Sequence, residues 1–463
     1  MRLKHYPLFV LAMKNMLSMA MPIVGSRVAY SISMFVSMLL IAHLGHAELA
    51  AGALINSVMF TLLVPIWQLF FATGILVGNN YGAKQFSEIG AIVRHSFILS
   101  IILGLPIMLI LWYIGTILVI LGQNQHLAEL TQQYFRAYVW TIIPGLWSLC
   151  LNQFLTGIGK QKTALIFTLC SIPMFIGIGF VLMHGKFGIS AFGISGMGYA
   201  NSIVTIIMVI VLIVYLAIKT EFQPYNLITF KAPSAVNYTK KLFVFGWPIA
   251  AMFAGELLLF SLATLLVGWL GETELAAWQI TVQINLIVIM FPMGIGQAGT
   301  ILISQSIGRN KYVMVRYLNY AALLLGLICV SIFSAAFLFA PQQLIALYLN
   351  ANNPANATTV HFAIMLLAIA ALMNVFDALR SICACTLRGL HDTILPMLIF
   401  VVLGTIISLP IGYWLGFSLH FGVTGIRWGF VIGFLVGAII LLCRSHKFSC
   451  PVYLATKFNQ CGD

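Results

Sequence analysis

The chain has 463 residues, of which 61% are hydrophobic and 7% are charged, and its mean hydropathy is +1.04. These values exclude a soluble globular protein, and the apolar runs are too long and too uniform for the strands of an outer-membrane barrel. The formal charge of +13 could suggest nucleic-acid binding, but the Lys and Arg residues fall mainly in short loops, as topology signals do. We therefore expect a polytopic helical membrane protein that contacts the lipid bilayer and no nucleic acid.

The apolar runs predict twelve membrane spans, because about 20 apolar residues cross a bilayer as a helix. The predicted spans are roughly 15–42, 48–79, 93–121, 130–156, 163–183, 194–218, 242–268, 274–306, 316–340, 358–387, 393–416 and 424–443. The longest basic loop falls in the middle of the chain. We therefore predict a first lobe at 1–218, a cytoplasmic connecting loop at 219–241, a second lobe at 242–445 and a cytoplasmic tail at 446–463.

The two halves of the chain are sequence repeats. A shift of 226 residues places Pro22-Ile23 on Pro248-Ile249 and Glu48–Ala51 on Glu274–Ala277. Later in each half, Phe192–Gly196 matches Phe421–Gly425. Six spans is an even number, so both halves must enter the membrane in the same direction. They are parallel repeats related by an axis along the membrane normal, a recurrent transporter design.

Charge sets the expected orientation of the spans. With both termini inside, the cytoplasmic segments hold eighteen Lys and Arg residues, whereas the outer loops hold three, namely Arg136, Lys186 and Arg427. Positive loops remain on the cytoplasmic side of a membrane. We therefore expect a multi-pass protein of the plasma (bacterial inner) membrane with both termini in the cytoplasm.

Two acidic residues lie well inside predicted spans. Glu256 is near the middle of the seventh span and Asp377 is within the tenth. A charged carboxyl there costs roughly 2.5 to 3.5 kcal/mol by insertion scales, so such groups usually face a cavity or a partner. The repeat register places Tyr30 opposite Glu256 and Gly145 opposite Asp377, so the acids belong to the second half alone. We interpret them as the ion sites of a transporter; the alternative is a hydrogen bond to a neighbouring helix that only aids packing.

The residues around the acids suggest a polar network. Small residues precede Glu256, and Asn374 and Ser381 share a helical stripe with Asp377 and could donate hydrogen bonds to it. Arg380 could pair with Asp377 along the helix or point towards another helix. Gln283 is a further candidate member of the network. Arg27 in the first span could be a partner for one of the acids.

Several stretches carry a family resemblance that extends over residues 10–445. They are Pro22–Val36, Gly78–Lys84, Gly185–Gly188, Gly193–Gly196, Leu275–Gln279, Phe291–Gly294 and Leu387–Asp392. In these stretches the chain resembles the multidrug and toxic compound extrusion (MATE) transporters, and more closely their NorM-like branch. The resemblance implies two six-helix lobes around a central cleft, and export of organic, often cationic compounds against an inward flow of H⁺ or Na⁺. It also implies an acid in the seventh span and another in the tenth, where Glu256 and Asp377 stand.

The chain departs from the family pattern in its first half. Ser37 stands where many bacterial members have Asp, and Phe175 and Gly179 stand where Asn is usual. A first-lobe cation site is therefore not expected, and coupling should lie in the second lobe. Met373 replaces a Tyr of some relatives, which favours H⁺ over Na⁺ as the ion at Glu256 and Asp377. We expect no cofactor and no resident metal.

The expected substrates are small organic, often cationic molecules. Aromatic faces attract such cations, so candidates to line the substrate cleft are Tyr30, Ser37, Phe260, Trp278 and Phe376, although core packing is the simpler role for each aromatic residue. The alternative function is a flippase for lipid-linked oligosaccharides or other lipid-like substrates of the same superfamily, to which Arg27 and Arg380 would suit phosphate. No HExxH or GxSxG motif is present, so we expect a transporter and not an enzyme. We expect it to be a monomer.

Overall fold

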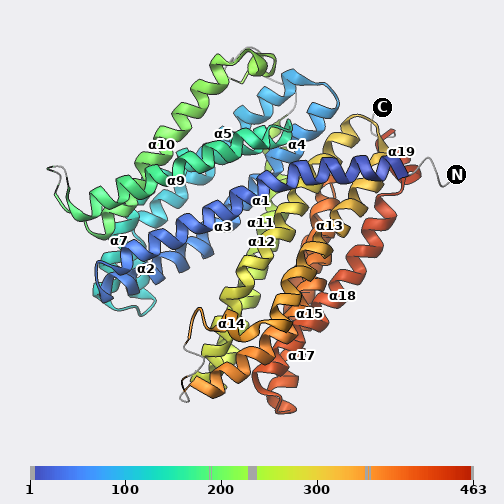
Figure 1. Ribbon diagram of the computed structural model, residues 1–463. Coiled ribbons are helices and arrows are strands. Elements are labelled where there is room, and N and C mark those ends of the chain that lie inside the picture. The colour runs from blue at the N-terminus through green and yellow to red at the C-terminus, as the bar shows by residue number, and fades with distance from the viewer. Residues whose placement is uncertain are drawn as a thin grey trace. The chain divides into compact units, whose positions relative to one another are not determined.

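The computed structural model describes residues 6–186, 188, 190–227, 237–349, 353 and 356–459, and every regular element in these ranges is helical (Figure 1). Eleven segments of this part of the chain are long and apolar enough to cross a membrane. They are Pro7–Ile41, His46–Gly82, Phe86–Trp112, Gln161–His184, Ile194–Ile218, Tyr238–Gly268, Glu272–Gly308, Tyr312–Phe339, Ala357–Gly389, Ile394–Ser418 and Gly422–Phe448. The predicted all-α polytopic membrane fold is confirmed.

The twelfth predicted span, 130–156, is divided in the structure. It consists of α7 (Gln125–Tyr138), the 3₁₀ turn η3 (Val139–Thr141) and α8 (Ile142–Gly157). Pro144 lies in the first turn of α8, has no N–H to donate and conflicts with the carbonyl four residues earlier. A continuous helix is therefore interrupted just before this proline, so neither piece has the length of a single span.

The remaining helices follow the predicted order. In the first half they are α1 (Tyr6–Ala42), α2 (His46–Val58), η2 (Met59–Leu63), α3 (Val64–Leu69), α4 (Phe71–Gly82), α5 (Phe86–Trp112), α6 (Ile114–Ile120), α9 (Gln161–His184), α10 (Ile194–Ile218) and η4 (Thr220–Tyr225). In the second half they are α11 (Tyr238–Gly268), α12 (Glu272–Gly308), α13 (Tyr312–Phe339), α14 (Pro341–Ile345), α15 (Ala357–Gly389), α16 (Ile394–Val402), η6 (Leu403–Ser408), α17 (Leu409–Tyr413), η7 (Trp414–Ser418), α18 (Gly422–Phe448) and α19 (Pro451–Asn459). The predicted connecting loop 219–241 lies partly outside the described residues.

The internal repeat is visible in the helix boundaries. The segment from α2 to α4 and the single helix α12 begin 226 residues apart and end 226 residues apart. Gly45 and Gly271 precede these segments with φ of 155° and 148°, a conformation that favours glycine. Lys84 and Asn310 follow them with φ of 60° and 55°. Turns as well as helices therefore obey the register that the sequence predicts.

The chain forms two compact units. The first unit is Gly25–Ala250, and the second combines Met1–Val24 with Ala251–Asp463. Both boundaries fall inside a helix, α1 in one case and α11 in the other, at positions related by the repeat. The start of α1 therefore contributes Met16 and Ile23 to a hydrophobic core of the second unit. The start of α11 likewise contributes Leu242 to the core of the first unit.

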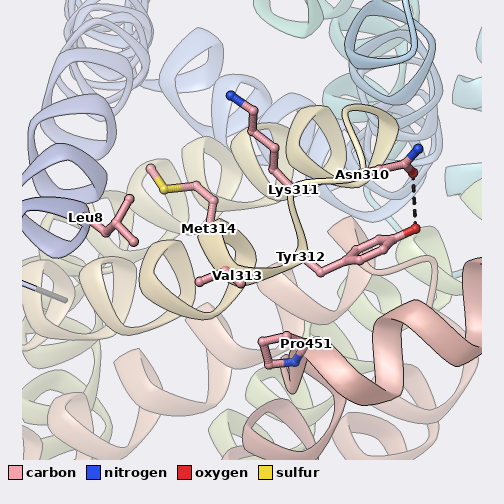
Figure 2. A pocket seen from close by; sticks show the side chains of 7 residues that line it. All are labelled: Leu8, Asn310, Lys311, Tyr312, Val313, Met314 and Pro451. Carbon is pink, nitrogen blue, oxygen red and sulfur yellow. Dashed lines mark hydrogen bonds between the residues drawn. The ribbon is translucent and has the colours of Figure 1, made fainter. Parts of the chain in front are cut away.

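Within the second unit, α12, α13, α15 and α18 pack against one another as long neighbouring helices (Figure 1). A pocket of about 490 Å³ lies where α13 begins, and Tyr312 donates a hydrogen bond to Asn310 at 3.1 Å on its wall (Figure 2). The other lining residues are Leu8, Lys311, Val313, Met314 and Pro451. None of them is acidic, so this pocket is separate from the two intramembrane carboxylates.

Candidate functional site

Glu256 and Asp377 are held by two helices of the second unit. Glu256 lies on α11 and Asp377 on α15, both away from the helix ends. Gly255 beside Glu256 allows close packing, because a Cβ there would lie 2.8 Å from Cγ2 of Val401 on α16. The small residue that the sequence placed beside the acid therefore brings a neighbouring helix close to it.

Arg380 bridges the two acids. Its Nη2 donates to Oδ1 of Asp377 at 2.7 Å and to Oε1 of Glu256 at 3.0 Å. The side chains are 3% exposed for Arg380, 8% for Asp377 and 20% for Glu256. Charges buried to this extent interact strongly because water screens them little. The question that the sequence left open is answered: Arg380 pairs with Asp377, and it also reaches the acid of another helix.

Two aromatic rings enclose the guanidinium. The Cζ atom of Arg380 lies 3.8 Å from the ring centroids of both Phe400 on α16 and Phe434 on α18. Gly437, one turn after Phe434, leaves space for the arginine stem, since a Cβ there would be 3.2 Å from its Cδ. The flat guanidinium is thus stacked between rings while its edge serves the acids, an arrangement that suits Arg and not Lys.

The other predicted network residues are not bonded to the acids. Asn374 is buried, and neither polar atom of its amide has a hydrogen-bond partner in the described part of the chain. Ser381 is half-buried and Gln283 is exposed, with no bond to Asp377 or Glu256 in the described residues. The partner of Asp377 is therefore Arg380, and the amide of Asn374 remains a buried polar group one turn away.

The candidate aromatic residues of the second unit lie in or against its core. Trp278 is fully buried and donates from Nε1 to Oγ1 of Thr264 at 3.0 Å. The ring of Phe260 lies 5.3 Å from that of Phe430, and Phe376 is half-buried against the same cluster. Packing therefore accounts for the observed contacts of all three.

The predicted residues of α1 belong to the first unit. Tyr30 is 47% exposed and Ser37 is half-buried. Arg27, considered as a partner for an acid, instead lies over the ring of Phe71 with 5.8 Å between Cζ and the centroid. The described acids are thus served by an arginine of their own unit.

Arg427 was placed in an outer loop by its position near the start of a span, and this placement is wrong. It lies inside α18 and is fully buried, with its Cζ 5.1 Å from the ring centroid of Trp278. Its matching position in the first half is Gly198, so the signal available in the sequence was a charged residue without a charged repeat partner.

Two carboxylates and a guanidinium buried inside a polytopic helix bundle define a membrane transport protein with an ionisable centre. The chain belongs to the MatE family, whose model matches residues 22–181 and 248–414. Both matched stretches begin at the repeated prolines Pro22 and Pro248, so the family unit coincides with the internal repeat.

Curated relatives cover nearly the whole chain. The probable multidrug resistance protein NorM of Mesorhizobium japonicum is 30% identical over 430 residues, 92% of each chain. That of Rhizobium meliloti is 31% identical over 438 residues, 93% of this chain and 92% of the relative. The NorM-like resemblance is confirmed.

Solved structures share the fold. The eukaryotic MATE transporter AtDTX14 matches with a TM-score of 0.82 at 19% identity, covering 96% of this chain and 98% of that one. A MATE protein in the straight conformation gives 0.85 at 17% identity, covering 95% and 96%. These likenesses confirm the predicted fold of twelve helices in two lobes.

Proposed function

We propose that the protein is an antiporter that exports amphipathic organic cations in exchange for inward H⁺. Its membership of the MatE family and the names of its relatives, multidrug resistance proteins, support the efflux class. The observation that carries the coupling proposal is the single guanidinium of Arg380 shared by Glu256 and Asp377. The centre lies wholly in the second unit, as the departures of the first half from the family pattern predict.

The charge balance of this triad explains exchange. Two ionised carboxylates in contact with one guanidinium carry one negative charge in excess, which one proton or one monovalent organic cation can offset. Proton and substrate therefore compete, and competition at one centre is what antiport requires. The more exposed acid, Glu256, is the better group to take up the proton, while Asp377 holds Arg380.

The surroundings of the triad favour H⁺ over Na⁺. Hard metal cations take several oxygen ligands at short range. Here the carboxylate oxygens face a guanidinium, and the next neighbours are the rings of Phe400 and Phe434. The same pairing argues against the flippase alternative, because the positive charge of Arg380 is already occupied by two acids and is not available to a phosphate.

Reconstituted protein tests the proposal directly. Proteoliposomes with an imposed pH or Na⁺ gradient would be assayed with a fluorescent organic cation. We expect a pH gradient alone to drive transport, Glu256→Gln to abolish it and Asp377→Asn to impair it severely. Ser37→Ala, the control in the first unit, should transport at nearly the wild-type rate. Full transport by Glu256→Gln, or transport driven by Na⁺ alone, would overturn the coupling proposal.

We also propose that both termini and the 219–241 loop face the cytoplasm, from the distribution of Lys and Arg. Single-cysteine variants at Tyr225 and Ala455 would be labelled in intact cells with a membrane-impermeant reagent. Neither position should react until the cells are opened. Reaction of either position from outside would reverse the proposed orientation.

A further inference from the structure

A second buried arginine in the second unit lacks the hydrogen bonds that Arg380 has. Arg427 is fully buried in α18, and none of its three guanidinium nitrogens has a hydrogen-bond partner in the described part of the chain. Its one favourable contact is the face of Trp278, 5.1 Å from Cζ to the centroid. An unpaired buried charge is costly, so a residue that only packed would be better served by an apolar side chain.

The charged groups around Arg427 come from one neighbouring helix. α15 carries Asp377 and Arg380, and Arg380 in turn contacts Glu256 of α11. α12 brings Trp278, and its acids Glu272 and Glu274 lie back in its first turn. The segment from α16 to η7 has no charged residue. Asp377 is the acid whose charge acts on Arg427.

The repeat shows that the fold does not require this arginine. The residues that match Glu256, Asp377, Arg380 and Arg427 in the first half are Tyr30, Gly145, Ser148 and Gly198. All four are uncharged, although the first half builds the same succession of helices. Arg427 therefore occurs in the same half as the triad, which indicates a role in the electrostatics of the ion centre.

We propose that Arg427 is the second counter-charge of this centre and makes proton and substrate binding mutually exclusive. The inference rests on the proposed antiport function. With Arg427 included, the ionised cluster is neutral, and uptake of one proton makes it net positive. A net positive cluster repels an organic cation, whereas the protonated triad alone would be neutral and would tolerate one. Arg427 acts through Asp377 as a positioning residue and need not touch the substrate.

The test is the pH dependence of cation binding. Equilibrium binding of ethidium to purified protein would be measured by fluorescence anisotropy between pH 5 and 8, for wild type, Arg427→Met and Arg427→Lys. Wild type should lose affinity as the pH falls. Arg427→Met, which keeps a stem to pack on Trp278 but no charge, should lose roughly tenfold less over the same range because a nearby buried charge is removed. Arg427→Lys keeps the charge and should retain most of the wild-type pH dependence.

Each outcome separates this inference from the antiport proposal. If Arg427→Met keeps the wild-type pH dependence and changes only thermal stability, Arg427 is structural and the inference fails. Glu256→Gln should abolish the pH dependence; if it does so while Arg427→Met does not, antiport stands and only the role of Arg427 is overturned. If Glu256→Gln leaves the pH dependence unchanged, the antiport proposal fails. Arg427→Gln supplies the same comparison should the Met variant not fold.

Discussion

The fourth span of the first half and the tenth span of the second half occupy the same place in the repeat but differ in structure. The fourth is broken into α7, η3 and α8, whereas α15 is one helix of 33 residues. Pro144 in the first half stands where Phe376 stands in the second. The uninterrupted helix holds Asp377 and Arg380 one turn apart on one face, where they can pair.

The same comparison separates scaffold from charge. Gly145 and Ser148 match Asp377 and Arg380, and a compact helical unit forms around them without an ion pair. The acids and the arginine are therefore not needed to build this fold. Buried ionic groups are expensive in a membrane, so their presence in one half alone indicates a functional requirement there.

Removing the bridge should have the largest effect. Arg380→Gln leaves two buried carboxylates without their cation, and breaking such a pair costs about 3–5 kcal/mol of stability. We expect a lower thermal unfolding temperature, followed by fluorescence-detected size exclusion, and loss of gradient-driven export. Any residual export should have its pH profile shifted upward, because the charge that favours ionised carboxylates is gone. Ser148→Ala is the matched control; an equal loss from it would contradict the asymmetry.

Breaking α15 should come next. Phe376→Pro copies the first-half residue into the second half and removes a helical hydrogen bond just before Asp377, at a cost of about 3 kcal/mol. We expect export to fail because Asp377 and Arg380 lose their common face. Pro144→Ala, the reverse change, should leave export near the wild-type level in the same proteoliposome assay. Normal export by Phe376→Pro would show that the pairing does not depend on a continuous helix.

The helices, the repeat and the two acids could be predicted because each is written in local pattern: long apolar runs, matched turns and isolated carboxyls. The bridge to Glu256 could not, because it joins residues 124 positions apart on different helices. Phe400 and Phe434 meet Arg380 only through helix packing. Pro144 was a visible helix disruptor, but Pro248 and Pro292 lie inside unbroken helices, so the sequence did not show which proline would interrupt a span.

The aromatic enclosure should contribute a moderate amount. Phe434→Leu keeps an apolar side chain but removes one ring face from Arg380, and cation–π contacts are worth about 0.5–2 kcal/mol. We expect a correspondingly small fall in thermal stability and a measurable fall in export. The matched first-half position is Thr205, and Thr205→Ala should change stability by no more than about 0.5 kcal/mol. Equal effects of the two changes would mean that the ring only fills space.

The smallest effects are expected at a charge-reversed pair of positions. Lys160 pairs with Glu221 in the first half, and Asp392, which matches Lys160 in the repeat, accepts from Nε of Arg444 at 2.6 Å in the second. The first pair is largely exposed, whereas Asp392 is 12% exposed. We expect Asp392→Asn to cost about 1 kcal/mol after solvent screening is allowed for.

Glu221→Gln should change thermal stability least. The hydrogen bond from Lys160 holds the pKa of Glu221 below its usual 4.5, so the pair stabilises the protein above that pH and ceases to do so as the carboxyl is protonated in acid. Any difference between Glu221→Gln and wild type should therefore be present at pH 7 and vanish as the pH falls below about 4. A larger loss at pH 7 from Glu221→Gln than from Asp392→Asn would show that exposure does not rank these two pairs.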